Sequence, residues 1–362
     1  MIRLVTAFVA YSVAVALPAA QAPAPDYRVY VASEAADKIS LLRFDGAAFH
    51  LERQFDTGVM PVDIDGPHGL ALNAAGTALF VSIAHGQPNG VLWKYSTTTH
   101  QVVGRTTLGM FPATLQVSPS GEFVYVVNFN LHGDPVPSSV SIVHAESMTE
   151  LARVTTCRMP HGSRFNPQGT RHYSACMMDH RVVEIDTATL RVAREFRLSP
   201  MADAGSHAAA HGADVSTPAG AACSPTWVQP SSDGSALFVA CNGSNEIVEI
   251  GVEAGSIRRR IGARNGVYNL ATTRDGRLLI ATNRRDQSAS VLDLATGRER
   301  ARLATPRRAV HGVAISADDR FAFVSSEGIG AESGSVIAID LAGLTIAATA
   351  QVPPQAGGID VR

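Results

Sequence analysis

Seven short segments with a common pattern recur along this chain and constrain its fold more than any other feature. Each is a short run typical of a β-strand, and the first six end in a turn rich in Gly, Asp, Asn or Ser. They begin at Pro67, Pro112, Pro160, Pro225, Val267, Val310 and Ala356. The spacing between starts is 42 to 48 residues, with one exception of 65 between Pro160 and Pro225. A nearly constant period of this length is typical of repeat folds.

Each of the first six segments is followed by three more runs with strand character. In one repeat, PATLQVSPSG leads into EFVYVVNF and then into SSVSIVHA. The Gly and Asp residues between the first two runs supply the positive φ angles of tight hairpins. Four strands in a period of this length predict an all-β protein, a seven-bladed β-propeller with four-stranded blades.

The two ends of the chain fit together as one blade. The N-terminal runs YRVYVAS, KISLLRFDG and FHLERQFDTG correspond to the second, third and fourth strands of a repeat, and the C-terminal AGGIDVR is a first strand alone. We therefore predict that the C-terminal strand completes the N-terminal blade and closes the ring, which removes the exposed sheet edges. The result is a single propeller domain over residues 26–362, with residues 200–221 as an inserted loop that accounts for the longer spacing.

The first residues have the pattern of a secretory signal. Arg3 precedes a short apolar run over residues 4–17, and Ala20, Gln21 and Ala22 form a candidate cleavage site. These features predict a signal peptide over residues 1–22, with an uncleaved anchor as the alternative. We find no later segment long enough to span a membrane, and we expect a periplasmic or secreted protein that is a monomer.

Two partner classes are disfavoured by composition and motif. The formal net charge is −2, so no basic surplus exists to bind a nucleic-acid backbone. A CxxCH motif is absent from the sequence, so we expect no covalently attached haem.

The strand motifs FVYVVNF and LFVACNGSNEIVEI resemble those of the YVTN-repeat, YncE-like periplasmic seven-bladed propellers. The resemblance covers nearly the whole chain after the signal. It implies the seven-bladed ring and a periplasmic location. It implies little about activity, because propellers carry many unrelated functions.

The start of each first strand and the end of each second strand should lie at the same rim of the channel. Histidines and methionines are concentrated at these positions, and imidazole with thioether ligands would favour copper. Nitrous oxide reductase, whose propeller has the same architecture, binds copper with histidines at this rim. The predicted metal ligands are His68, His85, His161, Met177, His180 and His311. The alternative is that each histidine caps the start of a strand by bonding to neighbouring backbone.

A small ligand at the same rim is an equally open prediction, since convergent polar groups in a concave opening mark binding sites. The guanidinium groups of Arg164 and Arg284 could hold an anion there, or could form ordinary surface salt bridges. The predicted ligand-binding residues are His68, His161, Arg164, Trp227, Tyr268, Asn269 and His311.

Three functions remain open from the sequence. The first is an accessory or binding protein that holds a metal or small ligand, and that could serve another periplasmic protein as its partner. The second is an enzyme of lactonase, lyase or oxidoreductase-associated type, in which rim histidines and arginines act with a carboxylate such as Asp179 or Glu327. The third is a protein-interaction scaffold that uses the loop 200–221.

The four cysteines form two local pairs, Cys157 with Cys176 and Cys223 with Cys241. In each pair one cysteine precedes a first strand and the other ends the second strand of the same hairpin. The open end of an antiparallel hairpin brings such residues within the Cα separation that a disulfide needs. We predict two disulfides that staple these hairpins, in keeping with an oxidising compartment. Thiolate ligands of a metal are the alternative.

Overall fold

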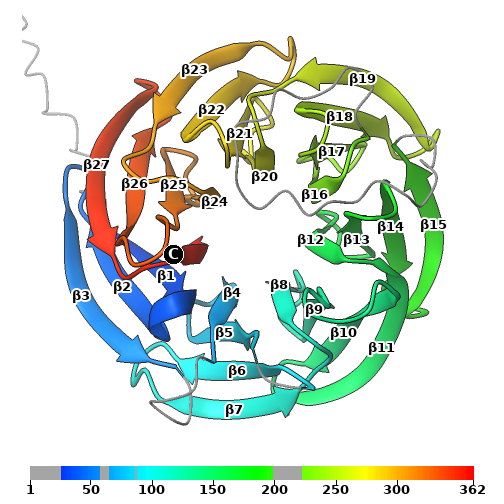
Figure 1. Ribbon diagram of the computed structural model, residues 1–362, viewed down its shortest axis with the longest axis horizontal. Coiled ribbons are helices and arrows are strands. Elements are labelled where there is room, and N and C mark those ends of the chain that lie inside the picture. Colours follow the sequence, from blue (N-terminus) through cyan, green and yellow to red (C-terminus); the bar gives the residue numbers. More distant parts are fainter. Residues whose placement is uncertain (1–25, 58–64, 86–87, 199–221) are drawn as a thin grey trace, which may run out of the picture.

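The computed structural model describes residues 26–57, 65–85, 88–198 and 222–362. Seven four-stranded antiparallel sheets stand in a ring around a central axis (Figure 1). The predicted all-β seven-bladed propeller is confirmed. Within the described ranges the one helical element is a single 3₁₀ turn, η1 (Glu34–Ala36), and none is long and apolar enough to cross a membrane. The predicted signal peptide 1–22 and inserted loop 200–221 lie outside the described residues.

Each blade contributes one strand to each of four concentric layers. The innermost strands are β4 (Pro67–Leu72), β8 (Pro112–Val117), β12 (Pro160–Phe165), β16 (Pro225–Pro230), β20 (Val267–Thr272), β24 (Val310–Ile315) and β28 (Ala356–Val361). The second strands are β1 (Tyr27–Ser33), β5 (Ala78–Ile83), β9 (Phe123–Asn128), β13 (Arg171–Cys176), β17 (Ala236–Cys241), β21 (Leu278–Asn283) and β25 (Phe321–Ser326).

The two outer layers complete the blades. The third strands are β2 (Lys38–Phe44), β6 (Val91–Ser96), β10 (Pro137–His144), β14 (Arg181–Asp186), β18 (Glu246–Gly251), β22 (Ser288–Asp293) and β26 (Gly334–Asp340). The outermost strands are β3 (Phe49–Asp56), β7 (Val102–Thr107), β11 (Thr149–Arg158), β15 (Arg191–Arg197), β19 (Ser256–Gly262), β23 (Glu299–Ala304) and β27 (Thr345–Val352).

All seven innermost strands begin at the residues that the repeat predicted. In six of them, from β4 to β24, the pairing with the second strand shifts just after the first residue. Pro67 pairs with Ile83, for example, but the next pair is Leu70 with Val81, which leaves one extra residue in β4. A β-bulge of this kind re-aims side chains. The residue directly after the strand start therefore lies in the bulge, and in three blades that residue is a histidine.

The ring is closed as predicted, by a C-terminal strand in the N-terminal blade. β28 pairs antiparallel with β1, with Val361 opposite Val29 and Ile359 opposite Val31, and the C-terminus lies at the channel in Figure 1. Apolar side chains fill the space between neighbouring blades. Phe44 and Phe323 meet across the closing interface with ring centroids 5.5 Å apart. Each fully buried Val, Ile or Phe stabilises the fold by about 1.5–3 kcal/mol.

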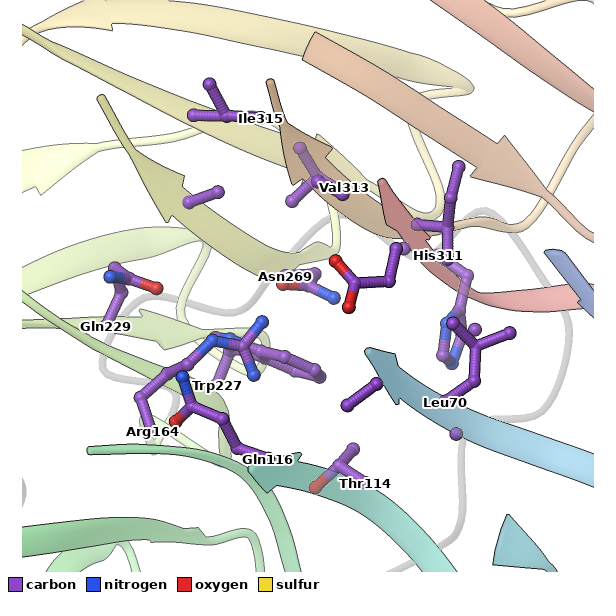
Figure 2. A pocket seen from close by; sticks show the side chains of 18 of the residues that line it. Leu70, Thr114, Gln116, Arg164, Trp227, Gln229, Asn269, His311, Val313 and Ile315 are labelled. Carbon is purple, nitrogen blue, oxygen red and sulfur yellow. The ribbon is translucent and has the colours of Figure 1, made fainter. Parts of the chain in front are cut away.

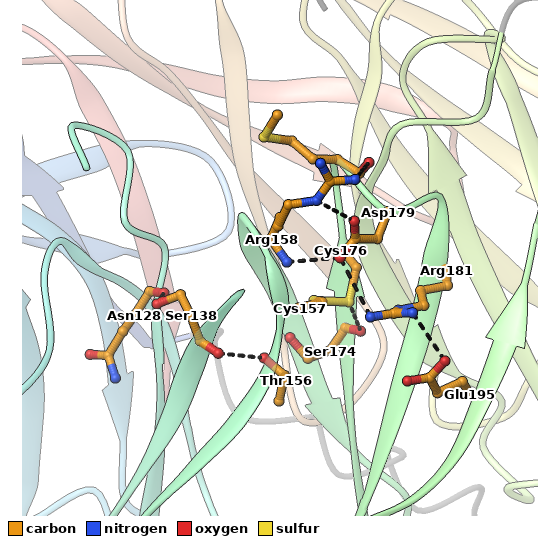
Figure 3. Close-up of a disulfide and its surroundings, with 11 residues drawn as sticks. Asn128, Ser138, Thr156, Cys157, Arg158, Ser174, Cys176, Asp179, Arg181 and Glu195 are labelled. Atoms are coloured by element: carbon orange, nitrogen blue, oxygen red, sulfur yellow. Dashed lines mark hydrogen bonds and ion pairs between the residues drawn. A yellow bond between two sulfur atoms is a disulfide. The ribbon is translucent and has the colours of Figure 1, made fainter. Parts of the chain in front are cut away.

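Both predicted disulfides are present, and they leave no free cysteine to act as a thiolate ligand. The Cα atoms of Cys157 and Cys176 are 5.9 Å apart (Figure 3), and those of Cys223 and Cys241 are 4.5 Å apart. The predicted placement of Cys157 is wrong in one respect. Because β11 extends to Arg158, Cys157 belongs to the outermost strand of the preceding blade. The first disulfide therefore joins two blades instead of closing one hairpin.

Candidate functional site

Three histidines from three different blades meet in the central channel. His68, His161 and His311 are the second residues of β4, β12 and β24, where the bulges lie. Each offers one ring nitrogen, and these three nitrogens lie within 4.8 Å of one another. The rings of His68 and His311 are perpendicular, with centroids 5.5 Å apart. His161 and His311 are buried and His68 nearly so.

Hydrogen bonds outside the cluster fix two of the three rings. His68 Nδ1 lies 2.5 Å from a carboxylate oxygen of Glu34, and His161 Nδ1 lies 2.9 Å from the carbonyl oxygen of Thr226. Both oxygens accept, so Nδ1 donates in each case, and in the neutral form of either ring Nε2 keeps its lone pair. Nε2 of His161 is 3.0 Å from the hydroxyl of Tyr268. Metal-binding histidines are oriented in this way.

Glu34 is a site residue that the sequence reasoning missed. It follows β1 directly, and its buried carboxylate bridges His68 and His85, with His85 Nε2 at 2.7 Å. Burial alone would raise the pKa of this carboxyl, but the two histidines outweigh burial and hold the pKa well below its usual value. In the other blades, candidate site residues were sought directly after the second strand. Applied to the N-terminal blade, this search would have pointed to Glu34.

The three clustered histidines differ in charge. Burial lowers the pKa of His68, but Glu34 outweighs burial and the pKa is raised. Burial, with the neighbouring charge of His68, lowers the pKa of His161 to about 3. Burial, His68 and Arg284 lower the pKa of His311 well below its usual value. At neutral pH His161 and His311 are therefore neutral imidazoles, the form that binds metals.

An ion pair lies next to His311. Arg284 donates two hydrogen bonds to Glu327, at 2.6 and 2.8 Å, and its guanidinium carbon lies 5.2 Å from the centre of the Tyr268 ring. Nε2 of His311 is 3.8 Å from the same carboxylate. Glu327, one of the two carboxylates that the sequence suggested, thus lies beside the cluster.

The two other predicted histidine ligands are not part of the cluster. His85 bonds to Glu34 and lies one step outward, and His180 Nδ1 accepts the backbone N–H of Ser224 at 3.1 Å. Met177 packs against an apolar group that includes Phe111 and Phe129. All three follow second strands, which stand one layer farther from the axis than the inner strands.

The second suggested carboxylate is also elsewhere. Asp179 accepts from Arg158 at 2.6 Å and pairs with Arg181 at 3.5 Å beside the first disulfide (Figure 3). These two arginines hold the carboxylate in a structural ion pair at the blade junction.

A cavity of about 240 Å³ occupies the channel on one side of the histidines. His68 and His311 line one end, and Arg274 and Asp319, from the turns after β20 and β24, line the other. Three more of the predicted ligand-binding residues, Arg164, Trp227 and Asn269, line its wall (Figure 2). Of the remaining two, His161 and Tyr268, neither lines the cavity, and they contact each other beside it.

No protein-family model matches the chain, and a search of curated proteins finds no match. Solved structures share its fold. The periplasmic gluconolactonase PpgL of Pseudomonas aeruginosa is 20% identical, with 93% of this chain and 99% of that chain covered and a TM-score of 0.69. A functionally unknown protein from Desulfotomaculum acetoxidans is 14% identical, with 92% and 98% covered and a TM-score of 0.70.

A third similar structure is hydrazine synthase of Kuenenia stuttgartiensis, at 19% identity, 78% and 80% coverage and a TM-score of 0.61. All these identities are low, so the similarities show the propeller fold and leave the activity open.

Proposed function

We propose that this protein binds one divalent transition-metal ion through His68, His161 and His311. The observation that carries the proposal is the convergence of three ring nitrogens, within 4.8 Å of one another, from strands far apart in the chain. Tetrahedral Zn–N bonds of about 2.0–2.1 Å place ligand nitrogens about 3.3 Å apart. The nitrogens therefore need to close by at most about 1.5 Å, which small side-chain rotations provide.

Strand capping, the alternative drawn from the sequence, explains only one of the three histidines. His161 bonds to a backbone carbonyl, but His68 bonds to a carboxylate. Among the described residues, His68 Nε2 and His311 Nδ1 are buried without a hydrogen-bond partner. Leaving such atoms unsatisfied costs about 1–3 kcal/mol each. A metal bound by the cluster would use His68 Nε2 directly.

The set of ligands favours Zn²⁺ or Cu²⁺. The preference for copper rested partly on the thioether of Met177, and this side chain packs against an apolar group that includes Phe111 and Phe129. Three imidazoles suit Zn²⁺ and Cu²⁺ alike, and Cu²⁺ binds such sites more tightly. We therefore propose a three-histidine site without a sulfur ligand.

We also propose that the protein works outside the cytoplasm. Two disulfides support this location, because such bonds persist in oxidising compartments. The secretory pattern over residues 1–22 gives independent support from the sequence.

Calorimetric titration of the EDTA-treated full chain with ZnCl₂ and CuCl₂ tests the proposal. We expect one ion per chain, and a loss of affinity of at least about tenfold in His161→Ala and in His311→Ala, since each removes one of three ligands. His144→Ala is the matched control, because His144 is a half-buried residue of β10 outside the cluster and its ring hydrogen-bonds to Ser147 in its own turn. Thermal unfolding of each variant confirms that it is folded. Native affinity in both cluster variants would refute the site.

A metal-assisted hydrolase is the second candidate, and the position of the cavity favours it. His68 and His311 line the cavity, so a metal with three protein ligands would face it with an open position. Catalytic zinc sites have this pattern, with a bound water as the nucleophile. The fold similarity to a gluconolactonase suggests the assay, which is hydrolysis of δ-gluconolactone with and without added Zn²⁺. A rate that His311→Ala leaves unchanged would count against this candidate.

A further inference from the structure

Arg164 places a positive charge inside the channel, away from the three histidines. It lies on β12 three residues beyond His161, which is about 10 Å along a strand. Its guanidinium carbon is 4.6 Å from the centre of the Trp227 ring, and it donates one hydrogen bond, 2.9 Å long, to the carbonyl of Ser163. Among the described residues no carboxylate forms a close ion pair with it, and Asp360 interacts with it at longer range. A cation in such a position needs an anionic partner to offset the cost of burial.

More hydrogen-bonding groups line the same wall. The Trp227 Nε1–H group is buried without a partner in the described part of the chain. Gln116 uses its side-chain oxygen to accept the backbone N–H of Phe165 at 2.6 Å, which leaves its NH₂ group as a donor. Figure 2 shows Arg164, Gln116 and Trp227 close together at this side of the cavity. Donors gathered around a guanidinium suit an oxyanion.

The other wall of the cavity carries apolar side chains of β4 and β24, with the Asp360 carboxyl on β28 between them. Leu70, Val313 and Ile315 lie across the cavity from Arg164 and Gln116 (Figure 2). A ligand that fills this space therefore has one polar end and an aliphatic body. Burial of such a body stabilises binding by about 25 cal/mol per Å² of apolar surface.

Asp360 limits the charge of the ligand. This carboxyl lines the cavity and accepts backbone N–H groups from Leu72 at 2.8 Å and from Val361 at 2.9 Å. A dianion such as phosphate would bring two negative charges towards it, whereas a monoanion brings only one. Like charges placed close together are unfavourable in a poorly solvated site.

We infer that the channel cavity binds a small aliphatic monocarboxylate, with its carboxylate on Arg164 and its chain against Leu70, Val313 and Ile315. The planar guanidinium matches the two carboxylate oxygens, and Trp227 Nε1–H and the Gln116 amide are placed to donate to the same group. This inference goes beyond the metal site and does not depend on it, because every group that it uses belongs to the protein.

The test is calorimetric titration of the EDTA-treated full chain with sodium hexanoate, against sodium chloride of the same ionic strength. We expect hexanoate to bind, inorganic phosphate to bind more weakly, and Arg164→Gln to weaken hexanoate binding at least about tenfold. Arg164→Lys should also weaken it, because an ammonium group lacks the planar fork. Arg277→Gln is the matched control, since Arg277 is exposed and pairs with Asp275 on a turn.

A second variant keeps the test decisive if Arg164→Gln does not fold. Trp227→Phe keeps an aromatic ring under Arg164 and removes the Nε1–H donor together with part of the ring, so hexanoate binding should fall several-fold, and thermal unfolding checks that the variant is folded. Unchanged binding in the folded variants would overturn the inference, as would no binding of hexanoate at millimolar concentration. Hexanoate that binds only after Zn²⁺ is added would also overturn it. That last result would place the carboxylate on the metal and would support the three-histidine site.

Discussion

The disulfide between Cys157 and Cys176 should stabilise the ring by about 3 kcal/mol. It closes a loop with a sequence separation of 19 residues, and the Cys223–Cys241 bond closes one of 18. The chain-entropy relation gives a loss of unfolded-state entropy of about 11 cal/mol/K for such loops. At 25 °C this is about 3.2 kcal/mol for each bond. The two disulfides should therefore contribute almost equally, although the first joins two blades.

Guanidinium unfolding followed by circular dichroism measures the effect. Cys157→Ala/Cys176→Ala and Cys223→Ala/Cys241→Ala should each lower the free energy of unfolding by about 3 kcal/mol. Alanine is preferred to serine because all four cysteines are fully buried and a hydroxyl there would lack a partner. Native protein unfolded in a reducing agent should lose stability in the same direction. A loss below about 1 kcal/mol in either variant would refute the reasoning from loop length.

Three further predictions concern charge and close packing. Burial raises the pKa of Tyr27 and of Tyr125 to about 12, so these phenols stay protonated in the fold at a pH where the unfolded chain, with a pKa near 10, has lost its proton. The contribution of these two phenols to the free energy of unfolding should therefore be constant below pH 10, and the free energy should fall between pH 10 and 12, as pH-dependent unfolding curves would show. Glu34→Gln should weaken metal binding about 10- to 100-fold in calorimetry, because it removes the charged acceptor that orients His68, and unchanged affinity would mean that Glu34 is not needed. Gly358→Ala should lower the melting temperature, because the added Cβ would lie 2.4 Å from the backbone oxygen of His68, and an unchanged temperature would show that the inner strands can separate there.

The repeat in the sequence was sufficient to predict most of the fold. Strand starts were predicted correctly at positions such as Pro67 and Val310. In each repeat the same kind of turn joins the first and second strands, so the repeats can be aligned on this turn. Cys157 was misplaced because the repeat marks where an inner strand begins but not where the outermost strand before it ends. β11 continues to Arg158, so the cysteine belongs to the preceding blade.

The sequence predicted the rim of the channel at which the candidate site lies. It did not predict which residues at that rim lie near the channel axis. Sequence register places both strand ends at one face of the ring, but it does not say that His68 lies at the axis while His85 lies one layer out. The bulges that turn the second residue of an inner strand inward are properties of the pairing between strands. The cavity wall around Arg164 depends on side-chain packing across several blades, which one sequence pattern does not reveal.

The pairing of β28 with β1 also determines when the protein becomes complete. β1 near position 30 pairs with β28 near position 360, so neither the first blade nor the ring can be finished before β28 has been synthesised. The same last strand carries Asp360 into the wall of the cavity. A product that is truncated or cut before Ala356 would lack both. Occupancy of the channel would then report that β28 is in place.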